Sequence, residues 1–327
     1  MDDAVLVTGG AGFIGSHTVA ALRAAGRRVV VLDDFSTGRR ENLAEWTGDS
    51  QVEVIAGDVR GDVAALLAGR GPFAAVVHLA AQTSVVRSIS APIDDLDLNL
   101  RATARLLLWA AAAGARRFVF ASSAAVYGEP RRVPVAESDP TAPLSPYGAA
   151  KRAAELYLGC LGPLYGVATA CLRLFNVYGP RQDPHSPYSG VVAAFLARAR
   201  RGESLVIFGD GTQTRDLVYV GDVARAIALA VGPGPTGHVL LKAGDTPPEP
   251  AGINVGSGRE TSILELAAAV QRVCGEDQPI AFAAARAGEI ARSAAVTEKA
   301  AELLGFRAEV ELEEGLRRTA AWLAGQS

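Results

Sequence analysis

The first 33 residues contain the feature that most restricts how this chain can fold. Residues 4–8 form a short apolar run typical of a buried parallel strand, and a turn with glycines at positions 9, 12 and 15 follows directly. A helical pattern over residues 16–25 leads to a second apolar run at 29–32, which ends at Asp33. This order of strand, glycine-rich turn, helix, strand and acid is typical of a dinucleotide-binding unit in a Rossmann-type doubly wound parallel sheet.

The residue types in this unit suit the chemistry of a dinucleotide. Gly9, Gly12 and Gly15 permit a tight turn and a close approach of the backbone to a pyrophosphate at the helix N-terminus. Asp33 follows near the place where an acid hydrogen-bonds the adenosine ribose. Because a carboxylate at this place would repel a 2′-phosphate, the sequence predicts NAD as the cofactor and argues against NADP.

A second constraining segment runs from Ser145 to Lys151. Ser145 suits a helix N-cap and Pro146 the first helical position, so we expect a helix to begin here. Tyr147 and Lys151 would then lie one turn apart on the same face. A lysine cation and the positive end of the helix would both lower the pKa of the tyrosine. Taken alone, such a pair is more often a surface tyrosine and a solvated lysine that share a helix face by chance, and only the rest of the chain favours catalysis.

Composition excludes several classes of function. The formal net charge of −3 gives no reason to expect a nucleic acid or an anionic membrane as partner. The histidines have no ligand-like spacing, so no metal site is expected, and no apolar run is long enough to span a bilayer. No signal peptide is recognisable, and the cysteines are expected to be buried small hydrophobes in a reducing compartment; they are Cys160, Cys171 and Cys274. The sequence therefore predicts a soluble, cytoplasmic protein.

The glycine spacing Gly-x-x-Gly-x-x-Gly, together with Tyr147 and Lys151, resembles the extended branch of the short-chain dehydrogenase/reductase superfamily. This branch modifies nucleotide sugars and includes the NAD-dependent epimerase/dehydratase family. The resemblance continues over about residues 4 to 306 and implies a Rossmann-type sheet with a smaller C-terminal α/β domain. It further implies an NAD-binding domain at residues 1–175, to which about 217–256 return, and a substrate domain at 176–216 and 257–327.

The resemblance also implies which residues contact the cofactor and perform catalysis. Ser123 lies 24 residues before Tyr147, where the family places a serine or threonine that hydrogen-bonds the tyrosine and completes a Ser-Tyr-Lys triad. Lys151 would orient the nicotinamide ribose and lower the pKa of Tyr147. The implied NAD contacts are Gly9, Gly12, Phe13, Ile14, Gly15, Asp33, Asp58, Val59, Leu79, Ala80, Ala81, Gln82, Asn99, Tyr147 and Lys151.

Further motifs match residues that hold a nucleotide sugar in this family. Asn176 matches a contact to the nucleotide sugar, and Arg215 and Arg286 match arginines that bind the diphosphate, a role suited to a planar cationic fork. The motif at Arg286 ends in glutamate where the family has aspartate. The complete set implied for the substrate is Ser84, Ser123, Tyr147, Asn176, Arg215, Arg286 and Ser293.

The residues after Ser123 narrow the reaction. Related dehydratases and decarboxylases carry acidic residues there, whereas this chain has Ala124 and Ala125, which can neither donate nor accept a proton. Elimination and decarboxylation are therefore disfavoured, and 4-epimerisation needs only the base and the cofactor. Residues 176–191 look most like bacterial UDP-glucose 4-epimerases, which implies a UDP-hexose substrate such as UDP-glucose and UDP-galactose.

One position bears on which sugars are accepted. Seven residues after Arg286, glucose-restricted epimerases carry a bulky tyrosine, whereas this chain carries Ser293. The resemblance then predicts room for an N-acetyl group, so that UDP-GlcNAc and UDP-GalNAc would also be substrates. A one-residue slip in an imperfect motif is the alternative interpretation.

Three other functions stay open at this point. The chain could act on UDP-glucuronate or another nucleotide sugar, or it could be a 4-keto reductase, although Asp33 argues against the NADPH that such an enzyme consumes. An NAD-sensing module without catalysis is a different class, but such proteins usually lose the tyrosine or the lysine. Relatives pair helices equivalent to residues 94–113 and 146–161 into a homodimer, although a buried face within one subunit would explain the same apolar pattern. Residues 232–252 are rich in proline and glycine and are expected to form a surface loop.

Overall fold

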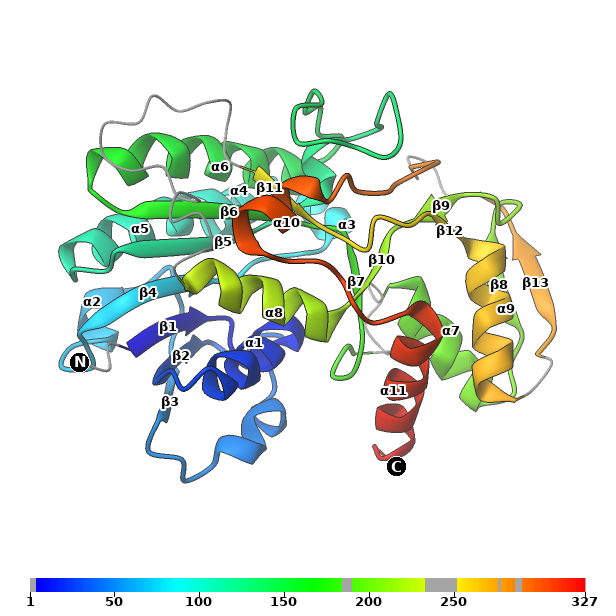
Figure 1. The fold of residues 1–327 in the computed structure, drawn as a ribbon, viewed down its shortest axis with the longest axis horizontal. Coiled ribbons are helices and arrows are strands. Elements are labelled where there is room, and N and C mark those ends of the chain that lie inside the picture. Colours follow the sequence, from blue (N-terminus) through cyan, green and yellow to red (C-terminus); the bar gives the residue numbers. More distant parts are fainter. Residues whose placement is uncertain (1–3, 184–189, 233–251, 276–277, 286–289, 327) are drawn as a thin grey trace.

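Seven parallel strands form the central sheet, in the order β3-β2-β1-β4-β5-β6-β11 (Figure 1). The computed structural model describes residues 4–183, 190–232, 252–275, 278–285 and 290–326. This order confirms the Rossmann-type sheet predicted from the sequence. Strands β2 and β3 are added on one side of β1 and strands β4, β5 and β6 on the other, so the strand order reverses between β1 and β4. The strands are β1 (Ala4–Thr8), β2 (Val29–Asp33), β3 (Val52–Ala56), β4 (Phe73–His78), β5 (Arg117–Ser123), β6 (Ala168–Leu174) and β11 (Gly252–Val255).

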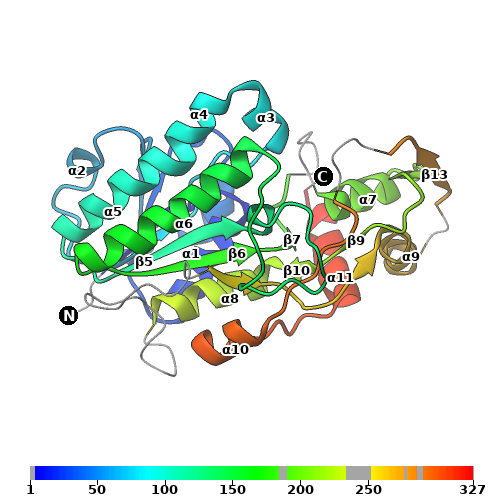
Figure 2. The ribbon, with the colours of Figure 1, turned by 90° about the horizontal axis from the view of Figure 1, so that it is seen from above.

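Helices cover both faces of this sheet (Figure 2). One face packs against α1, α8 and α10, and the other against α2, α5 and α6. Parallel strands buried on both faces need nearly continuous apolar sequences, which the runs at residues 4–8 and 29–32 supply. These helices are α1 (Phe13–Ala24), α2 (Val63–Leu66), α5 (Ala102–Ala112), α6 (Pro146–Leu164), α8 (Val220–Val231) and α10 (Glu298–Leu304).

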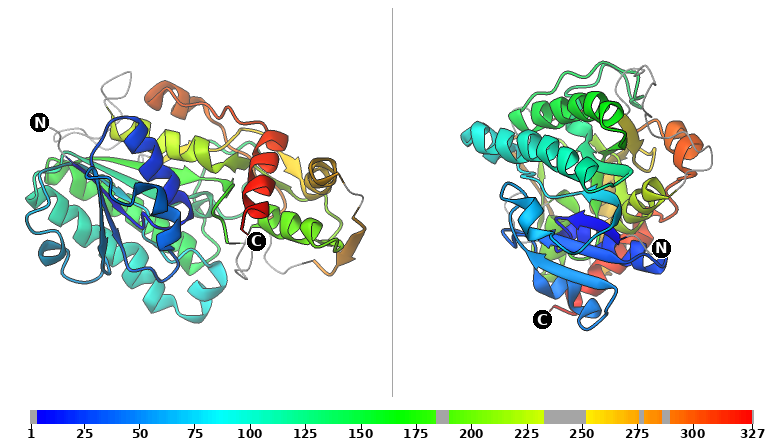
Figure 3. Two further views of the ribbon diagram at one scale, coloured as in Figure 1. Left: turned by 90° about the horizontal axis from the view of Figure 1, so that it is seen from below. Right: turned by 90° about the vertical axis from the view of Figure 1, so that its left-hand side faces the viewer.

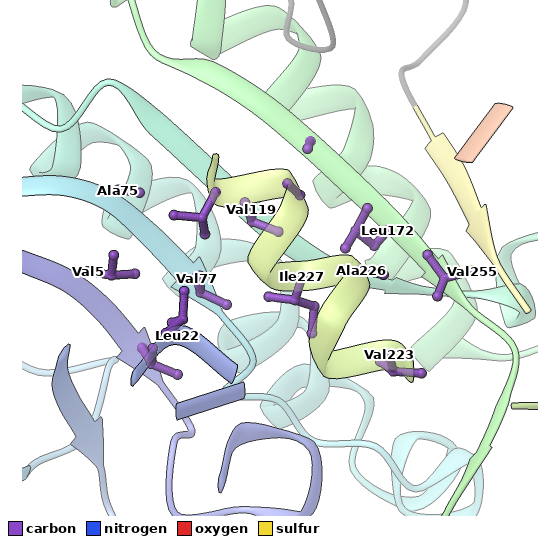
Figure 4. Close-up of a cluster of buried hydrophobic side chains, with 14 of the residues drawn as sticks. Val5, Leu22, Ala75, Val77, Val119, Leu172, Val223, Ala226, Ile227 and Val255 are labelled. Atoms are coloured by element: carbon purple, nitrogen blue, oxygen red, sulfur yellow. The ribbon is translucent and has the colours of Figure 1, made fainter. Parts of the chain in front are cut away.

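Alternate residues of each strand enter the two cores on either side of the sheet. In the core beneath α8, Ile227 lies among side chains of three strands, including Val77, Val119 and Leu172 (Figure 4). Leu6 of β1 belongs to the opposite core, beneath α5 and α6. Each such fully buried aliphatic side chain stabilises the fold by about 1.5–3 kcal/mol, so the sheet is a rigid platform for the loops at its ends.

A smaller lobe lies at the other end of the molecule (Figures 1 and 3). Its core is built from α7, α9 and α11 with the parallel pair of β8 and β13. The pair of β7 and β10 and the pair of β9 and β12 connect this lobe to the sheet. The elements are β7 (Asn176–Tyr178), α7 (Val191–Arg200), β8 (Leu205–Phe208), β9 (Thr214–Arg215), β10 (Leu217–Tyr219), β12 (Thr261–Ser262), α9 (Ile263–Cys274), β13 (Ile280–Ala283) and α11 (Leu312–Ala324).

The helical segment that precedes β5 contains an irregular turn. The predicted helix over residues 94–113 is present as α4 (Pro92–Leu96), a π-helical turn η2 (Asp97–Arg101) and α5, and α3 (Val85–Ser90) precedes it. Such π turns inside helices are common at functional sites. Short 3-10 turns are η1 (Arg40–Trp46) and η3 (Ala124–Val126).

Three sequence predictions differ from the structure. Helix α1 begins at Phe13, before the predicted residue 16, because the extended Gly12 already serves as its N-cap. The apolar run that begins at Leu172 predicts a strand, but strand β6 already begins at Ala168. The prediction of three buried cysteines holds only for Cys171, because Cys160 on α6 is exposed and Cys274 at the end of α9 is only partly buried. The expected loop at 232–252 falls almost wholly outside the described residues. No helix in the described part of the chain is long and apolar enough to cross a membrane.

Candidate active site

The reversal of strand order brings two predicted cofactor segments together at the carboxyl ends of β1 and β4. Thr8 and His78 are register partners at these ends, and the Thr8 hydroxyl lies 2.7 Å from Nδ1 of His78. The glycine-rich turn follows Thr8, and residues 79–82 follow His78. A Cβ atom on Gly9 would lie 2.6 Å from the backbone nitrogen of Ala80, and Gly9 has a φ of +71°. Only glycine permits this contact between the two loops.

The start of α1 fits a pyrophosphate. Gly12 is the N-cap residue of α1, and no side chain caps this helix end. The positive end of the helix and its first N–H groups are therefore available to an anion. A Cβ atom on Gly15 would collide with the carbonyl oxygen of Gly9. A larger residue would therefore distort the turn formed by Gly9, Gly12 and Gly15, which we call the glycine cradle. Phe13 and Ile14 occupy the first two helical positions between these glycines.

Asp33 lies at the end of β2 against the same turn. Its carboxylate accepts hydrogen bonds from the backbone N–H groups of Ala11 (2.8 Å) and Phe35 (2.9 Å). Burial raises the pKa of Asp33, and these two hydrogen bonds oppose the rise. The acid is thus fixed beside the turn, as the fit to an adenosine ribose requires.

Asp58, another predicted cofactor contact, follows β3. It forms an ion pair with Arg60 at 2.6 Å, which lowers the pKa of Asp58, and the neighbouring Val59 is buried.

Ser123, Tyr147 and Lys151 meet at the carboxyl end of β5. Ser123 is the last residue of β5, and its hydroxyl forms a hydrogen bond with the Tyr147 side chain. The Ser145 hydroxyl caps α6 by accepting from Gly148 N–H at 3.1 Å, which confirms the predicted helix start. Lys151 is buried one turn further along α6, where its ammonium donates to the Ala121 carbonyl at 2.9 Å. The structure therefore brings the three predicted catalytic side chains together.

The predicted lowering of the Tyr147 pKa is wrong. Burial raises the pKa of Tyr147, and the hydrogen bond from Ser123 only opposes this rise. The Lys151 ammonium contributes little because it faces elsewhere: it lies 4.6 Å from the centre of the Phe120 ring and 5.9 Å from that of the Tyr147 ring. A buried phenolate without a directly paired cation costs more than the neutral phenol.

Asn99 lies in the π turn and faces the loop after β4. Its amide group donates to the Gln82 carbonyl and to the Asp95 carboxylate, both at 2.9 Å. Gln82 donates to the same carboxylate oxygen at 2.8 Å. Ser84, a predicted substrate contact, is buried, and its hydroxyl caps α3 by accepting from Arg87 N–H at 3.1 Å. The loop over residues 79–84 is therefore tightly held where the cofactor is expected.

The buried Asp216 joins the segments that carry two predicted substrate contacts, Asn176 and Ser293. The Asn176 backbone donates to the Asp216 carbonyl at 3.0 Å. The Asp216 carboxylate accepts from the backbone of Ala295 at 3.0 Å, two residues beyond Ser293. Arg215 donates to the Ile290 carbonyl at 2.8 Å, so its segment also runs beside that of Ser293. Arg286 lies outside the described residues.

Sequence reasoning missed a buried ionic cluster beneath Ser123. Glu155, one turn beyond Lys151 on α6, accepts from Ser122 (2.6 Å) and from Nε and Nη2 of Arg173 (2.9 and 2.8 Å). Arg173 also donates to the Tyr127 hydroxyl at 2.8 Å. The signal was present, because Tyr147, Lys151 and Glu155 follow one helical spacing and Arg173 interrupts an apolar strand.

No group of three or more potential ligands from His, Cys, Asp and Glu side chains that could hold a metal ion occurs among the described residues. The residues after Ser123, including Ala124 and Ala125, form the short turn η3 and add no acid beside the triad.

Comparison with known proteins places these features in context. A family model described as "NAD dependent epimerase/dehydratase family" matches residues 5–241. A "UDP-glucose 4-epimerase" of Mycolicibacterium smegmatis is 41% identical over 324 residues, which cover 98% of this chain and 99% of that protein.

Two solved structures have the same fold over the whole chain. The UDP-N-acetylglucosamine 4-epimerase of Methanobrevibacter ruminantium, solved in complex with UDP-N-acetylmuramic acid, is 34% identical with a TM-score of 0.90 and covers 100% of this chain and 99% of its own. The UDP-glucose 4-epimerase of Thermus thermophilus, solved in complex with NAD, is 38% identical with a TM-score of 0.85 and covers 99% of this chain and 100% of its own.

Proposed function

Because this chain belongs to the NAD-dependent epimerase/dehydratase family, we propose that it is an NAD-dependent UDP-sugar 4-epimerase that interconverts UDP-glucose and UDP-galactose. The names of its relatives support this reaction, and one solved relative carries NAD. The single observation that carries the proposal is local. Ser123, Tyr147 and Lys151 converge at the carboxyl edge of the sheet that also carries the glycine-rich turn, and no acid from the adjoining η3 joins them.

The cofactor site fits NAD. The glycine cradle and the uncapped start of α1 suit the pyrophosphate, and the fixed Asp33 suits an unphosphorylated adenosine ribose. The chemistry that bound NAD supplies is the reversible acceptance of a hydride from C4 of the sugar, and its positively charged ring favours a nearby phenolate. Lys151 would hold the nicotinamide ribose, and the loop over residues 79–82 would line the site.

The protein's own residues would handle protons and orientation. Tyr147 takes the proton of the 4-hydroxyl, and Ser123 positions that hydroxyl through its hydrogen bond to Tyr147. Arg215 and Arg286 hold the diphosphate while the flat 4-keto sugar presents its other face, and Tyr147 then returns the proton. In this scheme Asn176 and Ser84 are further contacts to the nucleotide sugar.

The spectrum of the bound cofactor tests this proposal against the alternatives. Adding UDP-galactose to purified protein with stoichiometric NAD should produce a small absorbance band of bound NADH, because part of the sugar is held as the 4-keto form at steady state. A 4-keto reductase would need external NADPH for turnover. A sensing module would bind NAD without any such band, and this result would contradict the proposal.

We further propose that the pocket accepts N-acetylated sugars, since Ser293 is small. The similarity to a UDP-N-acetylglucosamine 4-epimerase supports this extension. Ser293→Tyr should lower kcat/KM for UDP-GalNAc by about tenfold or more while it leaves UDP-galactose within about twofold, because the added ring would fill the space for the acetamido group. Proton NMR of the anomeric signals measures both conversions. If wild-type protein converts UDP-galactose alone, the assignment of Ser293 is wrong and the epimerase proposal stands.

The domain assignment follows from the same scheme. We propose that residues 1–175 and about 217–256 bind NAD, whereas 176–216 and 257–327 bind the sugar nucleotide. The pairing of β11 with β6, which returns the chain to the central sheet, supports this division. The cytoplasmic location predicted from the sequence is part of the proposal.

A homodimer is also proposed, through the outer faces of α4 and α6. Large apolar side chains are exposed there, with 68% of Ile93, 50% of Leu156 and 52% of Tyr157 accessible. Such a face on neighbouring helices is typical of a subunit interface. Light scattering at micromolar concentration should give twice the chain mass of 33.8 kDa, and Leu156→Glu should shift the mass toward one chain. A single-chain mass for wild-type protein would contradict the proposal.

A further inference from the structure

Asp95 is a buried acid beside the catalytic triad to which the mechanism above assigns no role. It lies on α4 and only 1% of it is exposed. Among the described residues, no arginine or lysine forms an ion pair with its carboxylate. A buried carboxylate without a compensating charge is strongly unfavourable, so its presence requires an explanation.

The hydrogen bonds of Asp95 join three segments of the cofactor site. One carboxylate oxygen accepts from the side-chain amides of Gln82 and Asn99 at 2.8 and 2.9 Å. The same two amide groups also donate to the carbonyls of Ser84 (2.8 Å) and Gln82 (2.9 Å). Asp95 thereby fixes the loop after β4 to α4 and to the π turn.

The second carboxylate oxygen has no hydrogen-bond partner in the described part of the protein. The side-chain oxygen of Asn99 is likewise buried without one. Two unpartnered acceptors next to each other leave this corner of the site with an uncompensated negative potential. A cation that acts through space could compensate this potential without a direct contact.

Lys151 provides that cation. Helix α4 packs against α6, and the buried Lys151 ammonium contacts a carbonyl and an aromatic ring but forms no ion pair with an acid in the described ranges. Burial lowers the pKa of Lys151 to about 8, and Asp95 is the largest opposing influence. The effect is mutual, because Lys151 lowers the pKa of Asp95 against the rise caused by burial.

The other titratable groups around Lys151 do not take this role. Glu155 is neutralised by ion pairs with Arg173 (2.8 Å) and Arg152 (3.2 Å). Burial raises the pKa of the Cys171 thiol on β6, so the thiol stays neutral. Burial lowers the pKa of His78 on β4 to about 3, so that ring stays neutral as well. Tyr147 is a neutral phenol in this state, since burial raises its pKa.

We propose that Asp95 is a positioning residue of the reaction, whose fixed negative charge keeps Lys151 protonated while its hydrogen bonds hold the Gln82–Ser84 loop. This inference rests on the proposed function, because only there is the Lys151 cation needed to bind the nicotinamide ribose and to favour the Tyr147 phenolate. Asp95 carries an opposing cost, since its charge also raises the pKa of Tyr147. The same charge raises the pKa of Lys151, so the lysine stays mostly charged at neutral pH.

The chain has three lysines, Lys151, Lys242 and Lys299, so the Lys151 charge can be followed directly. Protein labelled with ¹³C at lysine Cε is titrated without cofactor, and Lys151→Arg and Lys299→Arg assign the signals. In Asp95→Asn, which keeps the shape and the acceptor oxygen, the Lys151 midpoint should move to lower pH. Asp94→Asn removes an exposed charge one residue away and should leave the midpoint unchanged. An unchanged midpoint in Asp95→Asn would overturn the proposal.

The pH profile of epimerisation is a second readout that a merely structural role would not move. Removing the charge lowers the pKa of both Tyr147 and Lys151, so both limbs of the kcat profile should move to lower pH, with about a tenfold loss of kcat on the alkaline side. An equal loss at every pH would contradict the charge role. If wild-type protein shows no epimerase activity, the proposed function fails, whereas the lysine titration still tests the pairing of Asp95 with Lys151.

A reciprocal measurement covers the case in which Asp95→Asn does not fold. In Lys151→Met, the Asp95 carboxyl signal, assigned by backbone-correlated NMR, should titrate at higher pH than in wild-type protein, since the compensating cation is gone. An Asp95 midpoint that does not respond to Lys151→Met would overturn the proposal by itself.

Discussion

Replacing Tyr147 with phenylalanine is expected to lower kcat for UDP-galactose by about 10³-fold, within the range that a positioned general acid and base contributes. The change removes one hydroxyl at the N-terminal turn of α6 and leaves the ring, the N-cap at Ser145 and the glycine cradle in place. NAD should therefore bind within a few-fold of wild type. Steady-state rates and a fluorescence titration with NAD measure the two effects.

Tyr165→Phe is the matched control for this variant, because Tyr165 is the C-cap residue of the same helix, is half exposed and lies at the opposite end of α6 from Tyr147. Its rate should equal that of wild type. If Tyr147→Phe retained a rate within tenfold of wild type, another group would have to serve as the base. A large loss of NAD binding in Tyr147→Phe would instead assign the tyrosine mainly to the cofactor.

Glu155→Gln is expected to destabilise the protein by about 3–5 kcal/mol, because it leaves the buried Arg173 guanidinium without its counter-charge. Arg173 and Glu155 are both about 1% exposed, and their paired atoms lie 2.8–2.9 Å apart. The pair joins α6 to β6 and, through Ser122, to β5. Urea unfolding followed by circular dichroism measures the loss from the midpoint and the slope.

Glu203→Gln is the control for this effect. Glu203 pairs with Arg201 on the surface, where ion pairs contribute little, and its midpoint should equal that of wild type. A loss below about 1 kcal/mol in Glu155→Gln would mean that apolar packing alone holds α6 in place. The stability prediction does not depend on the reaction assigned to the site.

The sequence was sufficient for the parts of the fold that local rules determine. The strand, glycine-rich turn, helix and strand of residues 4–33 specify their own geometry, and the N-cap and proline at residues 145–146 specify the start of α6. The triad was predicted from the resemblance to the family, in which a serine at the end of this strand and the Tyr-x-x-x-Lys pair of the following helix act together. The early start of α1 at Phe13 was missed because a glycine N-cap leaves no side-chain signal.

What the sequence could not supply was the surroundings of each charge. The spacing of Tyr147 and Lys151 suggested a direct pair, but the ammonium is turned toward Ala121 and burial outweighs its influence on the tyrosine. Glu155 and Asp95 both carry a carboxylate and are similarly buried, yet Glu155 pairs directly with arginines whereas Asp95 accepts hydrogen bonds only from side-chain amides. Such differences arise from contacts between distant segments, which no local pattern encodes.

The most direct test of the account is a proton NMR time course of the protein with NAD and UDP-galactose in D₂O. The account predicts that the anomeric signal of UDP-glucose appears and that its C4 position keeps a full proton, because the hydrogen removed from C4 is returned to the same carbon without exchange with solvent. No conversion, or a UDP-glucose product with deuterium at C4, would contradict it.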